Sequence, residues 1–329
     1  ARLQEVDAHM SRAQQKNIGV VQGTLGNLDR LLAQYGHRET LEKAVEIHRD
    51  LTLALHQQQT QPLDLVLWPE GTYPYPFPDK RPEHQALAEL THAINAPLVT
   101  GGHATQREPE YRYFNAMELI APGQDTASAI YKKHILLAFG EYMPLSNIFP
   151  ALKTLIPAIA DFGAGPGPQM MRYRDFKIAA IICYEALDPH YLRKYAQQGA
   201  NIILNSTNDS WYGKWQEQEQ HLALAQLRSV ETRLVQVRAT NTGISAMIMP
   251  DGKITHRAAR DVPTYFAAQV PLMELPPTFY ARHGDWWAWV MVLIVAGMMV
   301  YRWRAPFEKS AQQANSKETF RVTSKRRRG

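Results

Sequence analysis

The stretch FKIAAIICYEALDP, residues 176–189, gives the clearest indication of the fold. Residues 176–182 form a nearly unbroken apolar run, which is typical of a strand that is buried on both faces of a sheet. Residues 189–198 begin with a proline and end before Gly199, as a helix does. A buried strand followed at once by a helix indicates an α/β chain in which helices cover a sheet.

The rest of the chain repeats this alternation of strands and helices. Strands are predicted at residues 17–23, 63–67, 97–100, 112–120, 126–132, 201–205, 234–239 and 244–249. Helices are predicted at 38–58, 82–94 and 216–229. Turn-forming pairs such as Pro122-Gly123 and Asp251-Gly252 separate several of these segments. The pattern favours one layered α/β domain.

Cys183 ends the first strand described above and is the only cysteine in the 329 residues. A single cysteine excludes an intramolecular disulfide and a multi-cysteine metal site. Free cysteines are most often buried and inert, so a structural thiol is the alternative to a nucleophile. The nucleophile is favoured because Glu70 and Lys133 also follow predicted strands, in WPEGTYP (68–74) and YKKHILLAFGEYMP (131–144). A carboxylate can take the thiol proton, and an ammonium can stabilise a thiolate or an oxyanion.

These motifs resemble the nitrilase superfamily, and within it they most resemble the apolipoprotein N-acyltransferases. NSTNDSWYG at 205–213, the segment 220–245 and TFYARHGDWWAW at 278–289 carry the same resemblance. The likeness spans residues 17–303, which is nearly the whole chain. It implies a nitrilase-like α-β-β-α sandwich with a C-terminal transmembrane helix. It also implies a catalytic triad of Glu70, Lys133 and Cys183.

Lys132 and Lys133 are neighbours, and strand alternation places them on opposite faces, so only one can enter the site. In the family, a Tyr-x-Lys motif precedes Phe-Gly-Glu, with the lysine eight residues before that glutamate. Counting back from Glu141 gives Lys133, which leaves Lys132 as a surface charge. The family usually has histidine and proline where this chain has Ile135 and Ala138, and this departure concerns the substrate rather than the triad.

The resemblance also implies roles for residues around the triad. Glu141 is expected to orient the lysine and the reacting group, with a salt-bridged structural role as the alternative. Tyr184 and Glu185 follow the nucleophile, and the backbone N–H of Tyr184 is an expected oxyanion donor alongside Lys133. Three further residues follow a strand and are expected to line the pocket: Asn208, Asp209 and Trp211.

The remaining charged residues of the C-terminal half have structural interpretations. Four of them are expected to make ion pairs: Arg228, Glu231, Arg233 and Arg238. His221 has no potential metal ligands at the usual spacing, so we expect a hydrogen-bonding histidine. The sequence has no glycine-rich phosphate loop and no metal-binding cluster, and the implied chemistry needs no cofactor.

Residues 145–171, LSNIFPALKTLIPAIADFGAGPGPQMM, interrupt the alternation of strands and helices. They are rich in apolar residues, proline and glycine. One interpretation is a packed loop. The other is an apolar lid over an acyl-chain entrance, with Phe149, Leu152 and Phe162 among its apolar side chains.

The activity that the resemblance implies is transfer of an acyl chain from a phospholipid, through a thioester on Cys183, to an apolipoprotein. The acceptor is the N-terminal amine of a diacylglyceryl-cysteine. Two alternatives stay open. One is a membrane-tethered nitrilase-type amidase that uses water as the acceptor, and the other is a related conjugal-transfer membrane component with a non-catalytic role.

Residues 286–301, WWAWVMVLIVAGMMVY, carry no charge and have aromatic residues at both ends. At ~1.5 Å per residue they reach about 24 Å, slightly less than the ~30 Å hydrocarbon core of a bilayer. A buried core helix is the alternative. The terminal position, the aromatic ends and the basic flank favour a membrane span.

The basic residues are concentrated after this span. Nine lysines and arginines and two glutamates lie in 302–329, so this tail carries a charge of +7 and residues 1–301 carry −2. The positive-inside rule places the tail in the cytoplasm and the preceding domain on the periplasmic face of a bacterial inner membrane. We therefore expect a bilayer, a phospholipid donor and an apolipoprotein acceptor as partners, no nucleic acid, and a monomer.

The expected organisation has four parts. Residues 1–16 are a linker, 17–275 the catalytic domain, 276–303 the approach to the membrane and the transmembrane helix, and 304–329 the basic tail. The chain begins without methionine and without a signal peptide. Because a periplasmic domain must be exported, we expect that the membrane helices that precede it in the family are missing from this chain or were removed from it.

Overall fold

The structure is a computed structural model that describes residues 2–24, 37–146, 148–152, 161–210 and 216–303. The chain divides into two compact units, Ala1–Arg282 and His283–Gly329. The strands and the candidate site lie in the first unit, and an apolar helix lies in the second.

Six strands form the first sheet, in the order β12-β1-β2-β3-β4-β5. Their bounds are β1 (Gln14–Gln22), β2 (Leu65–Leu67), β3 (Leu98–Gln106), β4 (Arg112–Ile120), β5 (Ala127–Lys132) and β12 (Thr264–Leu272). The three strands β1, β2 and β3 are parallel, and the other pairs are antiparallel. The β3–β4 pair extends from Leu98 opposite Ile120 to Gln106 opposite Arg112, and this register positions the polar residues of the site.

The second sheet also has six strands, in the order β11-β10-β9-β8-β7-β6. Their bounds are β6 (Met171–Tyr173), β7 (Phe176–Ile182), β8 (Ile202–Thr207), β9 (Val235–Thr240), β10 (Ala246–Ile248) and β11 (Ile254–Arg257). The central strands β7, β8 and β9 are parallel. Almost every residue of these three strands is buried, as expected for strands that are covered on both faces.

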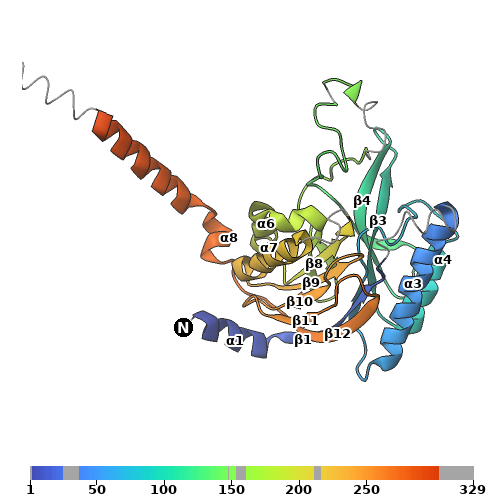
Figure 1. The fold of residues 1–329 in the computed structure, drawn as a ribbon. Coiled ribbons are helices and arrows are strands. Elements are labelled where there is room, and N and C mark those ends of the chain that lie inside the picture. Colours follow the sequence, from blue (N-terminus) through green and yellow to red (C-terminus); the bar gives the residue numbers. More distant parts are fainter. Residues whose placement is uncertain (1, 25–36, 147, 153–160, 211–215, 304–329) are drawn as a thin grey trace, which may run out of the picture. The chain divides into compact units, whose positions relative to one another are not determined.

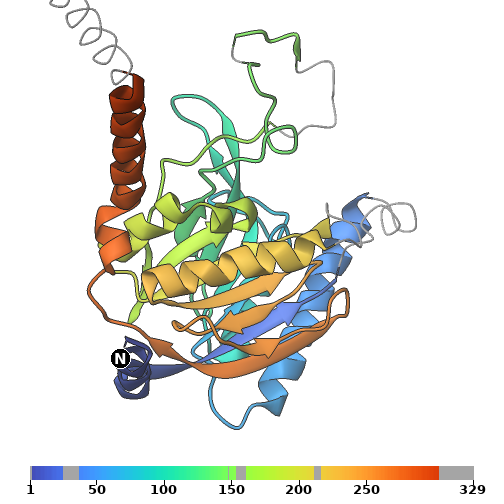
Figure 2. The same ribbon diagram turned by 60° about the vertical axis from the view of Figure 1, so that its left-hand side comes forward.

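The two sheets pack face to face around one apolar core. Fully buried residues of both sheets meet there, among them Val20, Leu67, Met117, Ile181, Leu204 and Val237. Helices α3 (His37–Gln58) and α4 (His84–Ile94) cover the outer face of the first sheet (Figure 1). Helices α6 (Pro189–Gln197) and α7 (Glu217–Thr232) cover the second sheet (Figure 2). The layers are helix, sheet, sheet and helix, so the predicted α-β-β-α sandwich is confirmed.

The structure differs from the prediction at both ends of this unit. Residues Arg2–Arg12, expected to belong to a linker, form helix α1, and β1 begins at Gln14 rather than at residue 17. Val6 of α1 is buried, so an apolar contact anchors a segment whose composition is mostly polar. Strands β11 and β12 are not predicted, because many of their side chains are only half-buried or exposed and they lack a continuous apolar run.

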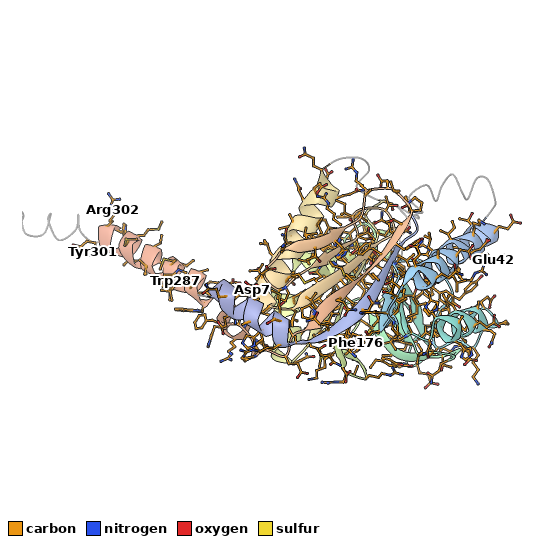
Figure 3. All side chains as sticks on the ribbon, turned by 90° about the horizontal axis from the view of Figure 1, so that it is seen from below. Asp7, Glu42, Phe176, Trp287, Tyr301 and Arg302 are labelled. Atoms are coloured by element: carbon orange, nitrogen blue, oxygen red, sulfur yellow. The ribbon has the colours of Figure 1, made fainter. Side chains whose placement is uncertain are left out.

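The described part of the second unit contains one long apolar helix, Trp286–Trp303. It has 18 residues, a mean hydropathy of 1.4 and no buried portion. Figure 3 labels Trp287, Tyr301 and Arg302 along it. Among the described helices it is the one that is long and apolar enough to cross a membrane.

Candidate active site

Cys183 lies directly after β7, at the first residue of the short helix η1 (Cys183–Leu187). Its φ of +48° is in the left-handed region, which costs a residue with a Cβ atom about 1–3 kcal/mol. The thiol-bearing residue is only 8% exposed. A strained turn at the end of a buried strand fixes the direction in which the side chain points, which suits a nucleophile better than a packing residue.

Glu185 is the residue that fastens this turn. It is fully buried, and its Oε2 accepts a hydrogen bond of 2.8 Å from the backbone N–H of Ile182. Its Oε1 accepts 2.7 Å and 2.8 Å bonds from the Tyr131 hydroxyl and the His134 N–H, which lie at the end of β5. Glu185 therefore joins the nucleophile turn of one sheet to the lysine strand of the other, and its carboxylate is fully engaged in doing so.

Glu70 lies just beyond β2 and presents both carboxylate oxygens to polar partners. Oε1 accepts a 2.7 Å bond from Asn115 Nδ2, and Oε2 accepts a 2.9 Å bond from the backbone N–H of Asn208. Gly101 makes room for it, since a Cβ atom at that position would lie 2.5 Å from the Cα of Glu70. The position of Glu70 is thus set by its backbone contact with β3 and by two donors.

Lys133 follows the last residue of β5 and is 1% exposed. Its Nζ donates to Glu141 at 2.8 Å and 2.9 Å, and it lies 3.6 Å from Glu70 Oε1. Lys132 points elsewhere: its Nζ donates to Gln106 and lies 4.2 Å from the centroid of the Phe114 ring. The two lysines therefore occupy opposite faces, as alternation predicts, and Lys133 is the one beside the carboxylates.

Asn115 is a site residue that the sequence interpretation missed. It lies in the middle of β4, is buried, and its Nδ2 donates to Glu70 Oε1 at 2.7 Å and to Glu141 Oε1 at 2.8 Å. Its backbone carbonyl also accepts a 2.9 Å bond from the Lys133 N–H. One amide thus fixes the spacing of two carboxylates and the lysine strand. An asparagine between the apolar residues Phe114 and Ala116 of a predicted strand was the available signal.

Burial and charge shift the pKa values of the three central groups. Burial raises the pKa of Glu70, and the Lys133 ammonium offsets part of that rise. Burial alone would lower the pKa of Lys133, but the acids around it, led by Glu70, raise it overall. Burial first, and then the Glu70 carboxylate, raise the pKa of the Cys183 thiol. These shifts favour the protonated forms of the Cys183 thiol and the Lys133 ammonium, and they make Glu70 a better proton acceptor than an exposed glutamate.

The other predicted site residues have different surroundings. Tyr184 is 39% exposed beside the nucleophile. Asn208 is half-buried, and its backbone N–H donates to Glu70. Asp209, expected to line the pocket, is instead fully buried, because its carboxylate pairs with Arg238 Nη2 at 2.9 Å. Trp211 lies outside the described residues.

The predicted lid falls partly outside the described residues, which omit 147 and 153–160. Phe149 is 59% exposed, whereas Leu152 is half-buried. Phe162 is packed: its ring stacks 5.8 Å from that of Tyr113, and its N–H donates to the Glu141 carbonyl at 3.0 Å. The segment therefore combines exposed apolar side chains with a residue that contacts the catalytic region.

The described residues contain no group of three or more histidine, cysteine, aspartate and glutamate side chains that could hold a metal ion. His221 instead makes hydrogen bonds, as predicted, to Asp209 and to the Cys183 carbonyl.

Comparison with known sequences points to one family. The sequence model of the carbon-nitrogen hydrolase family matches residues 18–278. The chain is 34% identical, over 300 residues, to an apolipoprotein N-acyltransferase of Bdellovibrio bacteriovorus, and the match covers 86% of this chain and 53% of that protein. It is 32% identical to one of Geobacter metallireducens over 232 residues, 70% of this chain and 44% of that protein. The chain spans about half the length of the curated relatives it matches.

Solved structures share the fold at lower identity. A carbon-nitrogen hydrolase from Helicobacter pylori G27 matches with a TM-score of 0.57 at 14% identity, covering 78% of this chain and 89% of that one. An amidase from Nesterenkonia sp. matches with a TM-score of 0.54 at 18% identity, covering 82% and 96%. At these identities the likeness is one of fold.

Proposed function

This chain belongs to the carbon-nitrogen hydrolase family, and from that premise we propose that it is an N-acyltransferase of lipoproteins. The donor is a phospholipid, and the acceptor is the N-terminal amine of a diacylglyceryl-cysteine on an apolipoprotein. The observation that carries the proposal is the placement of Glu70 and Lys133 beside a sole cysteine on a strained turn, in a chain whose curated relatives bear that activity in their names.

In the first half-reaction, the Cys183 sulfur attacks the ester carbonyl carbon of the phospholipid while Glu70 takes the thiol proton. The oxyanion of the tetrahedral intermediate is stabilised by the Lys133 ammonium and by the backbone N–H of Tyr184. The carbon–oxygen bond then breaks, and Glu70 returns the proton to the departing alkoxide. The products are a lysophospholipid and a thioester on Cys183.

In the second half-reaction, the α-amine of the apolipoprotein attacks the thioester carbonyl carbon. Glu70 removes a proton from the attacking nitrogen, and the same donors stabilise the second oxyanion. The carbon–sulfur bond breaks, the amide product leaves, and the proton held by Glu70 restores the Cys183 thiol. Protons and electrons balance without any cofactor.

The hydrogen bonds of the lysine support this division of labour between the two glutamates. Lys133 is bonded to Glu141 at 2.8 Å and 2.9 Å, but lies 3.6 Å from Glu70. Glu141 therefore orients and neutralises the lysine, which leaves Glu70 free to exchange protons. The raised pKa of Glu70 also suits a base that must take up a proton and keep it until the leaving group accepts it.

The proposal places the enzyme in the bacterial inner membrane as a monomer. Support comes from the apolar helix Trp286–Trp303 and from the basic residues of 302–329. The catalytic unit would then lie on the periplasmic face, with the tail in the cytoplasm. Exposed Leu145, Ile148 and Phe149, 59–67% accessible, supply an apolar surface suited to a lipid substrate.

The test is acylation of Cys183 by a phospholipid. The full chain in lipid vesicles should gain one acyl mass on Cys183 in intact-protein mass spectrometry, and a synthetic diacylglyceryl peptide should then remove it as an N-acyl product. Cys183→Ser should remain folded and form no thioester. Turnover of small amides with no adduct from phospholipid would replace the proposal with a water-dependent amidase.

A further inference from the structure

The backbone carbonyl of Cys183 has a partner that the proposed chemistry does not use. It accepts a hydrogen bond of 3.2 Å from His221 Nε2, on helix α7. The side chain of His221 is buried, so water does not compete for this contact. The residue that presents the nucleophile is therefore held at its carbonyl by a side chain 38 positions away.

His221 is itself held by two buried, charged residues. Its Nδ1 lies 2.8 Å from Asp209 Oδ1 and 3.2 Å from Arg238 Nη2, and the same Nη2 donates to Asp209 Oδ2 at 2.9 Å. Burial, followed by the Arg238 charge, lowers the pKa of His221, and the Asp209 carboxylate opposes this shift. Asp209 Oδ1 and the Cys183 carbonyl oxygen can only accept hydrogen bonds, so the ring bonds both of them when Nδ1 and Nε2 each carry a proton, and Nε2 then donates to the Cys183 carbonyl.

The direction of this carbonyl determines the direction of the next N–H. A trans peptide unit is planar, so its C=O and N–H bonds point in opposite directions. A carbonyl that is tied to His221 on one side must aim the Tyr184 N–H toward the other side. The φ of +48° at Cys183 is strained, so the turn persists only where surrounding contacts hold it, and the bond to His221 is one of these contacts.

We infer that His221, set by Asp209 and Arg238, is a positioning residue that locks the Cys183–Tyr184 peptide unit so that its N–H serves as an oxyanion donor. The inference rests on the proposed thioester mechanism only in requiring attack of Cys183 on a carbonyl carbon. It assigns a catalytic purpose to a buried polar cluster that otherwise has only a structural role.

The cluster also reaches the general base. Asp209 follows Asn208, whose N–H donates to Glu70 Oε2 at 2.9 Å. Asp209 cannot shift readily, since its N–H donates to the Thr242 carbonyl at 2.9 Å and its carboxylate packs against Gly243, where a Cβ atom would lie 2.6 Å from Oδ2. The buried carboxylate of Asp209 thus helps to fix the positions of both the Tyr184 N–H, which is the oxyanion donor, and Glu70, which is the base.

The test separates an effect on oxyanion stabilisation from an effect on the reactivity of the Cys183 thiol itself. Acylation of Cys183 by p-nitrophenyl butyrate passes through an oxyanion, whereas alkylation by iodoacetamide at a saturated carbon does not. His221→Leu should slow the acylation step on the order of 10²–10³-fold with little change in KM, because one oxyanion donor is lost. Alkylation and its pH profile should change by only a few fold.

His221→Gln keeps a side-chain N–H and serves as the conservative variant, and it decides the question if His221→Leu does not fold. We expect it to restore much of the acylation rate relative to alkylation. His48→Gln, which alters a buried histidine on α3, is the control for general destabilisation. Equal losses of acylation and alkylation in a folded His221 variant, or no loss of acylation in His221→Leu, would overturn the inference. Because the acyl donor in this test is a soluble ester, a failure to transfer acyl chains from phospholipids would refute the proposed function and would not overturn this inference.

Discussion

Replacing Lys133 with methionine removes the ammonium between two carboxylates while keeping the volume of the side chain. Lys133 lies 2.8 Å from Glu141 and 3.6 Å from Glu70, and it is almost fully buried. Removing one partner of such a buried charge cluster costs about 3–5 kcal/mol of folding free energy. At roughly 2–4 °C per kcal/mol for a unit of this size, Tm should fall by about 6–20 °C.

Lys132→Met is the matched control on the neighbouring residue. Lys132 is half-buried, and its Nζ donates to Gln106 and lies 4.2 Å from the centroid of the Phe114 ring. Such a contact is worth about 0.5–1 kcal/mol, so Tm should fall by only about 1–4 °C. Acyl transfer should be lost in Lys133→Met and retained in Lys132→Met.

The destabilisation of Lys133→Met should also depend on pH. The Lys133 charge lowers the pKa of Glu70, so its removal raises that pKa further. A carboxyl group whose pKa is raised by folding favours the folded state at low pH and opposes it as the pH rises. The Tm deficit should therefore be smaller at pH 5 than at pH 8 in calorimetry. Loss of transfer in Lys132→Met with a normal rate in Lys133→Met would refute the assignment of the lysine.

Three further outcomes follow from the described contacts. Asn115→Leu should slow thioester formation and lower stability by about 1.5–3 kcal/mol for each lost bond to a charged group, measured by mass spectrometry and calorimetry; a wild-type rate would exclude a role in setting Glu70 and Glu141. Glu118 is buried, neither of its side-chain oxygens is hydrogen-bonded among the described residues, and burial raises its pKa. Glu118→Gln should therefore raise Tm at pH 8 and leave it nearly unchanged at pH 4. The same dependence of Tm on pH as in the wild type would contradict this. Replacing Phe149, Leu152 and Phe162 together with serine should impair transfer from long-chain phospholipids more than transfer from a soluble short-chain ester, since each CH₂ of the acyl chain that is buried is worth ~0.8 kcal/mol. Equal losses with both donors would mean that the segment only supports the fold.

The elements that the sequence predicts well are those whose residues are buried on both faces. Strand β7 has the predicted bounds, because its nearly continuous apolar run leaves little choice of structure, and β4 has them although its buried part also holds polar residues. Strand β12 is not predicted, because its sequence has no alternating or continuous apolar pattern and the strand is recognised only by its pairing with β1. Helix α1 escapes for a similar reason, as its polar composition conceals one buried valine.

Within the site, prediction fails where a role depends on distant partners. Asp209 is found in a buried ion pair because Arg238 lies on the neighbouring strand β9, 29 positions later in the chain. Asn115 gains its role from two carboxylates that come from different loops. Chain order reveals which groups have suitable chemistry, but the register of the sheets decides which of them meet.

The nucleophile and the base of the proposed mechanism belong to different sheets, so in that mechanism the thickness of the core between them is a catalytic variable. Glu70 and Lys133 follow strands of the first sheet, and Cys183 follows a strand of the second. The hydrogen bonds of 2.7 Å and 2.8 Å from the Tyr131 hydroxyl to the Glu185 carboxylate connect the two sheets beside these residues. An apolar substitution that merely lets the sheets slide or separate by a fraction of an ångström would leave a folded protein whose thiol and base no longer meet.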